Sequence, residues 1–192
     1  MQRLNLFTKL VTMLLAPILW AGYYLDLLDW VIPLLLLTFL LAQWIQVKRN
    51  KGGQPAVPGY LLSLLFGIGA LLCALSAAFK SLNLLMYYPV AVNTIFLGAF
   101  AVSLRARQTV VEIIAQRTGA EITPQIKDYT RKVTIAWCCF FVVNGSIALY
   151  TALEGNIDLW TLWNGCLSYV CIGLMTAGEY LVRKRIQKRD LQ

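Results

Sequence analysis

The segment Val133–Leu153, with the sequence VTIAWCCFFVVNGSIALYTAL, decides the fold class of this chain. It runs for 21 residues without a charged side chain, and a helix needs about 20 mainly apolar residues to cross the hydrocarbon core of a bilayer. The run begins directly after Arg131 and Lys132 and ends directly before Glu154. An uncharged apolar run of this length, with charged residues at both ends, predicts a transmembrane helix.

Five other stretches of the sequence are long and apolar enough to cross a membrane. They are Leu6–Leu25, Trp30–Val47, Gly59–Ala78, Leu84–Leu104 and Leu159–Val182. The first is the weakest, because it is short and carries Pro17. The sequence therefore predicts an all-α fold, a polytopic transmembrane helix bundle of about six helices, with five as the alternative if the first segment is only half-inserted. Residues 1–192 are expected to form a single transmembrane domain with a cytoplasmic loop at 105–132.

The composition of the whole chain agrees with this fold class. Apolar residues make up 59% of the 192 residues and charged residues make up 14%, whereas soluble domains have about 45–50% and about 25%. A soluble domain of this length has too small an interior to bury so much apolar surface. Lipid is therefore expected to cover part of it.

The net charge of +8 is explained by membrane topology. Lysine and arginine accumulate in the short cytoplasmic loops of membrane proteins. Of the 17 basic residues, 16 fall at one set of predicted helix ends, and only Lys80 lies at the opposite set. Both termini are therefore expected to lie in the cytoplasm, and anionic lipid headgroups are the expected neighbours of the basic helix ends. These residues form no stripe with stacking aromatics, which argues against a nucleic-acid partner.

The residue types that most enzymes use are scarce in this sequence. It contains no histidine, and its five cysteines lie in apolar runs without a Cys-x-x-Cys pair. This excludes the usual zinc sites, Ser–His and Cys–His catalysis, and haem ligation by histidine. The sequence also has no nucleotide-binding loop. We therefore expect a protein that is not an enzyme and that needs no cofactor or metal.

Polar residues within the predicted spans are the candidates for a function, because burying them in lipid is costly. They are Asn93, Asn144, Asn164 and Glu179. Under a functional interpretation the asparagines form a polar core that contacts a substrate headgroup, and under a structural one they make hydrogen bonds between helices. In both cases we expect the asparagines to face the bundle interior. For Glu179, an i,i+4 ion pair with Arg183 is a sufficient explanation, and a proton-coupling carboxylate is the alternative.

Two local patterns predict helices in the long basic loop. The apolar residues of Val110–Ile114 lie on one helical face, which predicts a short helix over Gln108–Thr118 that lies on the membrane surface and ends at Gly119. Thr123 and Pro124 are typical of an N-cap and the first residue of a helix. The next helix is therefore expected to start in the cytoplasm and to enter the bilayer as one continuous rod.

The segment Lys132–Phe141, followed by Gly145, Ala148 and Tyr150, resembles bacterial intracellular septation protein A, whose penultimate helix carries a Leu-Ala-Trp-x-x-Phe-Phe segment. A closer resemblance is to a group of small Gram-negative inner-membrane proteins encoded beside aryl-polyene pigment and lipid biosynthesis genes. The stretches that carry it lie within roughly residues 84–186 and are Tyr87–Asn93, Tyr129–Thr134, Phe140–Gly145 and Ala177–Arg183. Asn144 departs from septation protein A, so a septation role is not carried over. The resemblance implies a multi-pass protein of the bacterial inner membrane that acts near envelope construction, and it supplies no catalytic residues.

The sequence and the resemblance together lead to one expected function and two alternatives. We expect a non-enzymatic inner-membrane protein that supports cell-envelope or lipid-like product biogenesis, as an accessory or interaction subunit beside other envelope-biogenesis membrane proteins. The first alternative is a small transporter or flippase for an amphiphilic product, which requires a continuous polar path. The second is a membrane enzyme acting on lipid, which requires convergent reactive groups.

The charge pattern generates a prediction about topology. Reporter fusions made after Asn50, Gly119 and Gln192 are expected to give a cytoplasmic signal, because the basic residues gather on that side. The measurement is a paired assay with one reporter that is active in the cytoplasm and one that is active in the periplasm. A periplasmic signal from the fusion after Gly119 would contradict the assignment.

Overall fold

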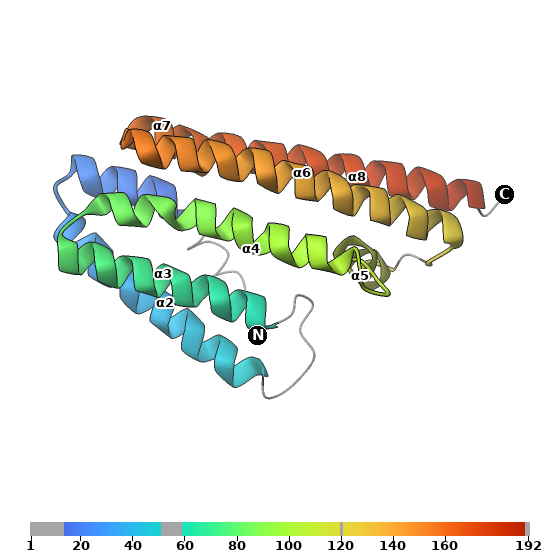
Figure 1. The fold of residues 1–192 in the computed structure, drawn as a ribbon, viewed down its shortest axis with the longest axis horizontal. Helices are drawn as coiled ribbons and strands as arrows, with labels where there is room; N and C mark the ends of the chain where they lie inside the picture. Colours follow the sequence, from blue (N-terminus) through green and yellow to red (C-terminus); the bar gives the residue numbers. More distant parts are fainter. Residues whose placement is uncertain (1–13, 51–58, 120, 191–192) are drawn as a thin grey trace. The chain divides into compact units, whose positions relative to one another are not determined.

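The computed structural model describes residues 14–50, 59–119 and 121–190, and all regular structure in these ranges is helical (Figure 1). Four helical spans are long and apolar enough to cross a membrane, and two shorter apolar helices, Leu14–Tyr24 and Ser63–Phe79, accompany them. The all-α class is therefore confirmed, and the number of apolar helices agrees with the expected bundle. These helices fit a multi-pass membrane protein.

The elements follow one another with short connections. After the helix Leu14–Tyr24 come α2 (Leu28–Asn50), α3 (Gly59–Phe79), the 3-10 helix η1 (Leu82–Tyr87), α4 (Tyr88–Ser103), α5 (Val110–Arg117), α6 (Pro124–Glu154), α7 (Ile157–Leu162), the π-helix η2 (Trp163–Leu167) and α8 (Ser168–Asp190). The first predicted span, Leu6–Leu25, is helical over its described part, and residues 6–13 lie outside the described ranges.

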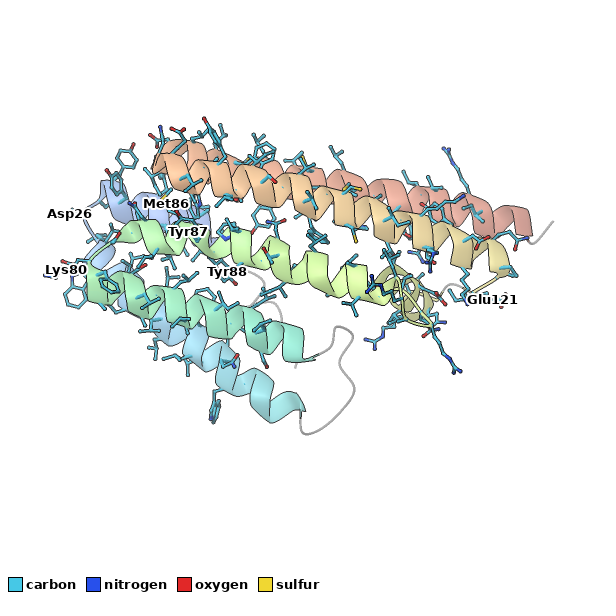
Figure 2. All side chains as sticks on the ribbon, in the orientation of Figure 1. Asp26, Lys80, Met86, Tyr87, Tyr88 and Glu121 are labelled. Atoms are coloured by element: carbon cyan, nitrogen blue, oxygen red, sulfur yellow. The ribbon has the colours of Figure 1, made fainter. Side chains whose placement is uncertain are left out.

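Two of the predicted spans are less regular than the sequence suggested. The span predicted as one helix over Leu84–Leu104 begins as the 3-10 helix η1 and becomes an α-helix only at Tyr88. Pro89 then falls in the first turn of α4, where a missing N–H breaks no helical hydrogen bond. Figure 2 labels Met86, Tyr87 and Tyr88 at this change of helix type. The last predicted span, Leu159–Val182, is interrupted by the π-turn of η2.

The chain divides into two compact units. One contains Met1–Val92 and Ser146–Leu167, and the other contains Asn93–Gly145 and Ser168–Gln192. We call them the first and the second unit. Residues of α4 and of α6 belong to both units, because the division falls inside these helices. The single transmembrane domain expected for residues 1–192 stays a prediction.

The core of the first unit forms around Trp160, which is fully buried and whose indole N–H donates a hydrogen bond to the Met86 carbonyl at 2.9 Å. Phe39 of α2 is also buried and packs on Tyr88, with ring centroids 5.3 Å apart. Gly69 of α3 makes room for the Phe39 ring, because a Cβ atom at Gly69 would lie 2.6 Å from that ring. The close packing of α2 on α3 therefore depends on a residue without a side chain (Figure 1).

Two tight turns of the first unit contain residues with left-handed backbone conformation. Asp26, between the helix Leu14–Tyr24 and α2, has a φ of 54°, and Lys80, between α3 and η1, has a φ of 49°. Figure 2 shows both residues at the same end of this unit. The chain thus reverses direction within two or three residues at each turn, which keeps these loops short.

The core of the second unit is a cluster of aromatic rings on α4 and α6. Phe100 and Phe141 are buried in it, with ring centroids 5.2 Å apart in an edge-to-face arrangement. Phe96 stacks on Phe141 at 5.6 Å, and Trp137 lies 5.7 Å from the same ring. Pairs of this geometry contribute about 0.5–1.5 kcal/mol beyond the area that they bury.

The helices predicted in the basic loop are present. Helix α5 begins after Thr109, whose hydroxyl accepts a hydrogen bond from the Glu112 N–H, and it is followed by Gly119 with a φ of 83°. The Thr123 hydroxyl accepts from the Ile126 N–H at 3.3 Å, so it caps α6 as expected. Helix α6 then continues for 31 residues without interruption. The position of α5 on a membrane surface stays a prediction.

Replacement of Gly69 by alanine is expected to lower the melting temperature in detergent, since the new Cβ overlaps the Phe39 ring and overpacking costs about 1–3 kcal/mol. Gly67→Ala is the matched control on the same helix, because a Cβ there meets only Gln43 at 3.9 Å. The control should melt at the parent temperature or above it, as alanine favours helix formation. Equal melting of both variants would contradict this account of the α2–α3 contact.

Candidate functional site

Asn93 of α4 and Asn144 of α6 form a polar pair in the second unit. Both side chains are buried, with exposed fractions of 6% and 5%, and the Asn144 side-chain amide donates to the Asn93 carbonyl oxygen at 3.0 Å. Their inward orientation, expected from the sequence, is confirmed. The bond satisfies groups that would cost several kcal/mol if they were left unpaired in an apolar interior.

Gly145 explains how the two helices come close enough for this bond. A Cβ atom at Gly145 would lie 3.1 Å from the Cβ of Asn93, a distance that few real side chains tolerate. The dipeptide Asn144-Gly145 therefore has two parts with separate tasks. The asparagine supplies the amide, and the glycine allows α4 to approach.

Asn164 lies in the first unit, within the π-turn η2, and it has different partners. Its side-chain amide donates to the Thr151 hydroxyl at 3.2 Å and to the Trp160 carbonyl at 3.0 Å. The Asn164 side chain thus links the π-turn to the Trp160 carbonyl in the last turn of α7. Asn164 is also buried, which confirms its predicted orientation.

Glu179 and Arg183 of α8 form the predicted i,i+4 ion pair, with 2.9 Å between Oε1 and Nε. Arg183 is buried and donates a further hydrogen bond to the Thr118 hydroxyl at 2.8 Å. The Tyr129 hydroxyl donates to the backbone carbonyl of Glu179 at 3.2 Å. These contacts tie α8 to the end of α5 and to α6, so they fasten the basic end of the second unit together.

In the first unit, two aromatic side chains bind one carboxylate, a contact that did not follow from the sequence. Asp158, in the first turn of α7, accepts hydrogen bonds from the Trp20 indole at 2.7 Å and from the Tyr24 hydroxyl at 2.9 Å. All three residues are exposed. The sequence does place aromatic residues at a predicted helix end. It does not indicate which carboxylate accepts their hydrogen bonds.

The candidate residues thus have partners in the protein itself. Asn93 and Asn144 come together, Asn164 pairs with Thr151, and Glu179 pairs with Arg183. A nucleophile with an adjacent base is not among these contacts. Within the described residues, these side-chain contacts hold the helices in position.

Comparisons with protein-family models, with curated proteins and with solved structures gave no match. The fold and the side-chain contacts are therefore the basis for any functional assignment. The resemblance to septation protein A and to the aryl-polyene-associated group stays an expectation.

Replacement of Asn144 by leucine is expected to lower the melting temperature in detergent, because it removes the bond to Asn93 and leaves that amide with one partner fewer. Bonds of this kind contribute about 0.6 kcal/mol on average in membranes, so a loss of this order is expected. The double variant Asn93→Leu with Asn144→Leu should lose less than the sum of the single losses. Val143→Leu, at an exposed neighbour, is the control. Additive losses would show that the two amides do not interact.

Proposed function

We propose that this chain is a non-enzymatic accessory subunit of a bacterial inner membrane. It supports the biogenesis of the cell envelope or of a lipid-like product, by binding other membrane proteins. In this proposal both termini and the loop at 105–132 are cytoplasmic, as the basic residues favour.

The observation that carries the proposal is the surface of the last span. In the four spans of the described chain, an apolar stretch of 18 residues within Ile157–Ile186 has 6% of its residues buried, whereas the corresponding stretches of the other three spans have 22–28%. The exposed side chains of this span include Leu174 and Leu181, with exposed fractions of 69% and 58%. This helix therefore keeps most of its apolar surface for lipid or for another protein.

Small residues on α8 favour a helix as the partner. Gly173 and Ala177 are exposed and are four residues apart, which places them on the same face. A Cβ atom at Gly173 or at Gly178 would meet no other atom within 4 Å, so neither glycine is required by the packing of this chain. Small residues at this spacing allow two transmembrane helices to approach closely.

The polar contacts weigh against the alternative of a transporter. A transport path needs polar groups that are available to a substrate, but the Asn144 amide donates to Asn93, and the Asn164 amide donates to Thr151 and to the Trp160 carbonyl. Pairing of this kind favours rigid helix packing. A protein with rigidly packed helices, whose last helix keeps an exposed apolar surface, suits the role of an accessory subunit.

The test is site-specific photo-crosslinking in native membranes. A photoreactive amino acid at Leu174 is expected to give a discrete adduct with another membrane protein, whereas one at Leu34 of α2, exposed to 64%, is the control and should give lipid adducts. Gly173→Ile should reduce the protein adduct several-fold without lowering the melting temperature, because the new side chain enters open space. Gly98→Ile, at another open glycine, should leave the adduct unchanged. Lipid adducts alone at Leu174 would contradict the proposal.

A further inference from the structure

An open hollow of about 780 Å³ lies at the basic end of the second unit, beside α5 and α6. Its lining comes from the loop before α5, from the first turn of α5 and from the first turns of α6. The lining residues are Ala106, Arg107, Gln108, Glu112, Lys127 and Arg131.

Glu112 is the unusual member of this set, because its side chain is buried, with 3% exposed. A buried carboxylate is costly unless a cation or hydrogen-bond donors compensate it. Three cationic side chains line the same hollow, namely Arg107, Lys127 and Arg131. The hollow therefore combines an excess of positive charge with one negative group that is fixed in its wall.

One of the two cations of α6, Arg131, is held in position by a hydrogen bond. Lys127 and Arg131 are four residues apart, so they project from one face of the helix. One Arg131 guanidinium N–H donates to the Leu104 carbonyl at 3.0 Å, just beyond the end of α4. A guanidinium has five N–H donors in a planar fork, so this bond orients the group and leaves donors for a ligand.

The wall that carries Glu112 is also fixed at both ends of α5. At the start, the Val110 N–H donates to the Ser103 hydroxyl at 3.2 Å, and Thr109 caps the helix. At the end, the Thr118 hydroxyl accepts the bond from Arg183. Glu112 and Arg131 are therefore positioned before a ligand arrives, which reduces the entropy cost of binding.

The position of the hollow along α6 matches the level of lipid headgroups in a bilayer. Arg131 lies two residues before Val133, where the uncharged run of α6 begins. At about 1.5 Å per residue, that is roughly 3 Å along the helix axis. If the run spans the hydrocarbon core, the guanidinium lies at the level of the lipid phosphates.

We propose that this hollow binds the headgroup of an amine-bearing phospholipid. Arg107, Lys127 and Arg131 bind the phosphate, since guanidinium and ammonium groups bind phosphate oxygens through charge-assisted hydrogen bonds. Glu112 binds the ammonium group of the same headgroup. This inference rests on the proposed function only in that it takes the chain to lie in a membrane. It adds a lipid ligand to that function.

The experiment measures binding to the full chain, purified in a non-ionic detergent. The probes are short-chain phosphatidylethanolamine, short-chain phosphatidylglycerol, which has a phosphate but no amine, and water-soluble glycerophosphoethanolamine. We expect phosphatidylethanolamine to bind most tightly. Arg131→Gln and Lys127→Gln should each weaken both lipids about tenfold, as expected for the loss of one charged hydrogen bond. Glu112→Gln should weaken phosphatidylethanolamine about tenfold and leave phosphatidylglycerol unchanged or tighter.

Lys132→Gln is the matched control, because Lys132 follows Arg131 on α6, is exposed and does not line the hollow. It should bind all three probes like the parent. Melting temperatures show which variants keep their fold. If Glu112→Gln melts below the parent, the Lys127 and Arg131 variants still test whether the phosphate binds in the hollow.

Three outcomes would overturn the proposal. Parent-like binding by both the Lys127 and the Arg131 variants would show that the phosphate lies elsewhere. Equal binding of the two lipids, unchanged in Glu112→Gln, would refute the role of the amine. Glycerophosphoethanolamine binding as tightly as the lipid would make the ligand a soluble phosphate compound. Because the chain is tested alone, these outcomes are independent of the crosslinking at Leu174.

Discussion

A polar group without a partner in an apolar interior costs several kcal/mol, and this cost constrains the packing in both units. In the second unit it brings Asn144 to Asn93, and Gly145 provides the space for that bond. In the first unit it brings the Trp160 indole to the Met86 carbonyl and Asn164 to Thr151. Each bond joins residues that are at least 13 positions apart. The polar side chains thus fix which helix faces meet, while apolar area alone would allow many arrangements.

Local patterns were sufficient to predict much of the fold. The start of α6 followed from Thr123 and Pro124, and the end of α5 followed from Gly119, because capping depends on neighbouring residues alone. The inward orientation of the asparagines also followed, since its cause is the cost of desolvation. The 3-10 helix η1 and the π-turn η2 did not follow, because hydropathy gives the length of a span and not the number of residues per turn.

Apart from the i,i+4 pair of Glu179 and Arg183, the partners of the candidate residues did not follow from the sequence. Arg183 and Lys184 are adjacent members of one basic run, yet Arg183 is buried with bonds to Glu179 and Thr118, and Lys184 is exposed. Arg131 and Lys132 are both exposed, yet only Arg131 lines the hollow. A count of charges predicts a sidedness for the chain by the positive-inside rule. It does not separate residues that set topology from residues that hold helices or form a binding surface.

The carboxylate of Glu112 shows how the balance of charges at a binding surface can favour one class of lipid headgroup over another. Three cations would be enough to attract any anionic headgroup, and a carboxylate beside them weakens that attraction. The same carboxylate favours a ligand that carries a positive group at a short distance from its phosphate. Specificity is a difference of affinities, and a repulsive group that penalises the wrong ligand contributes to it as much as an attractive one. A buried acid fixed in a basic wall therefore makes chemical sense as a means of distinguishing zwitterionic from purely anionic headgroups.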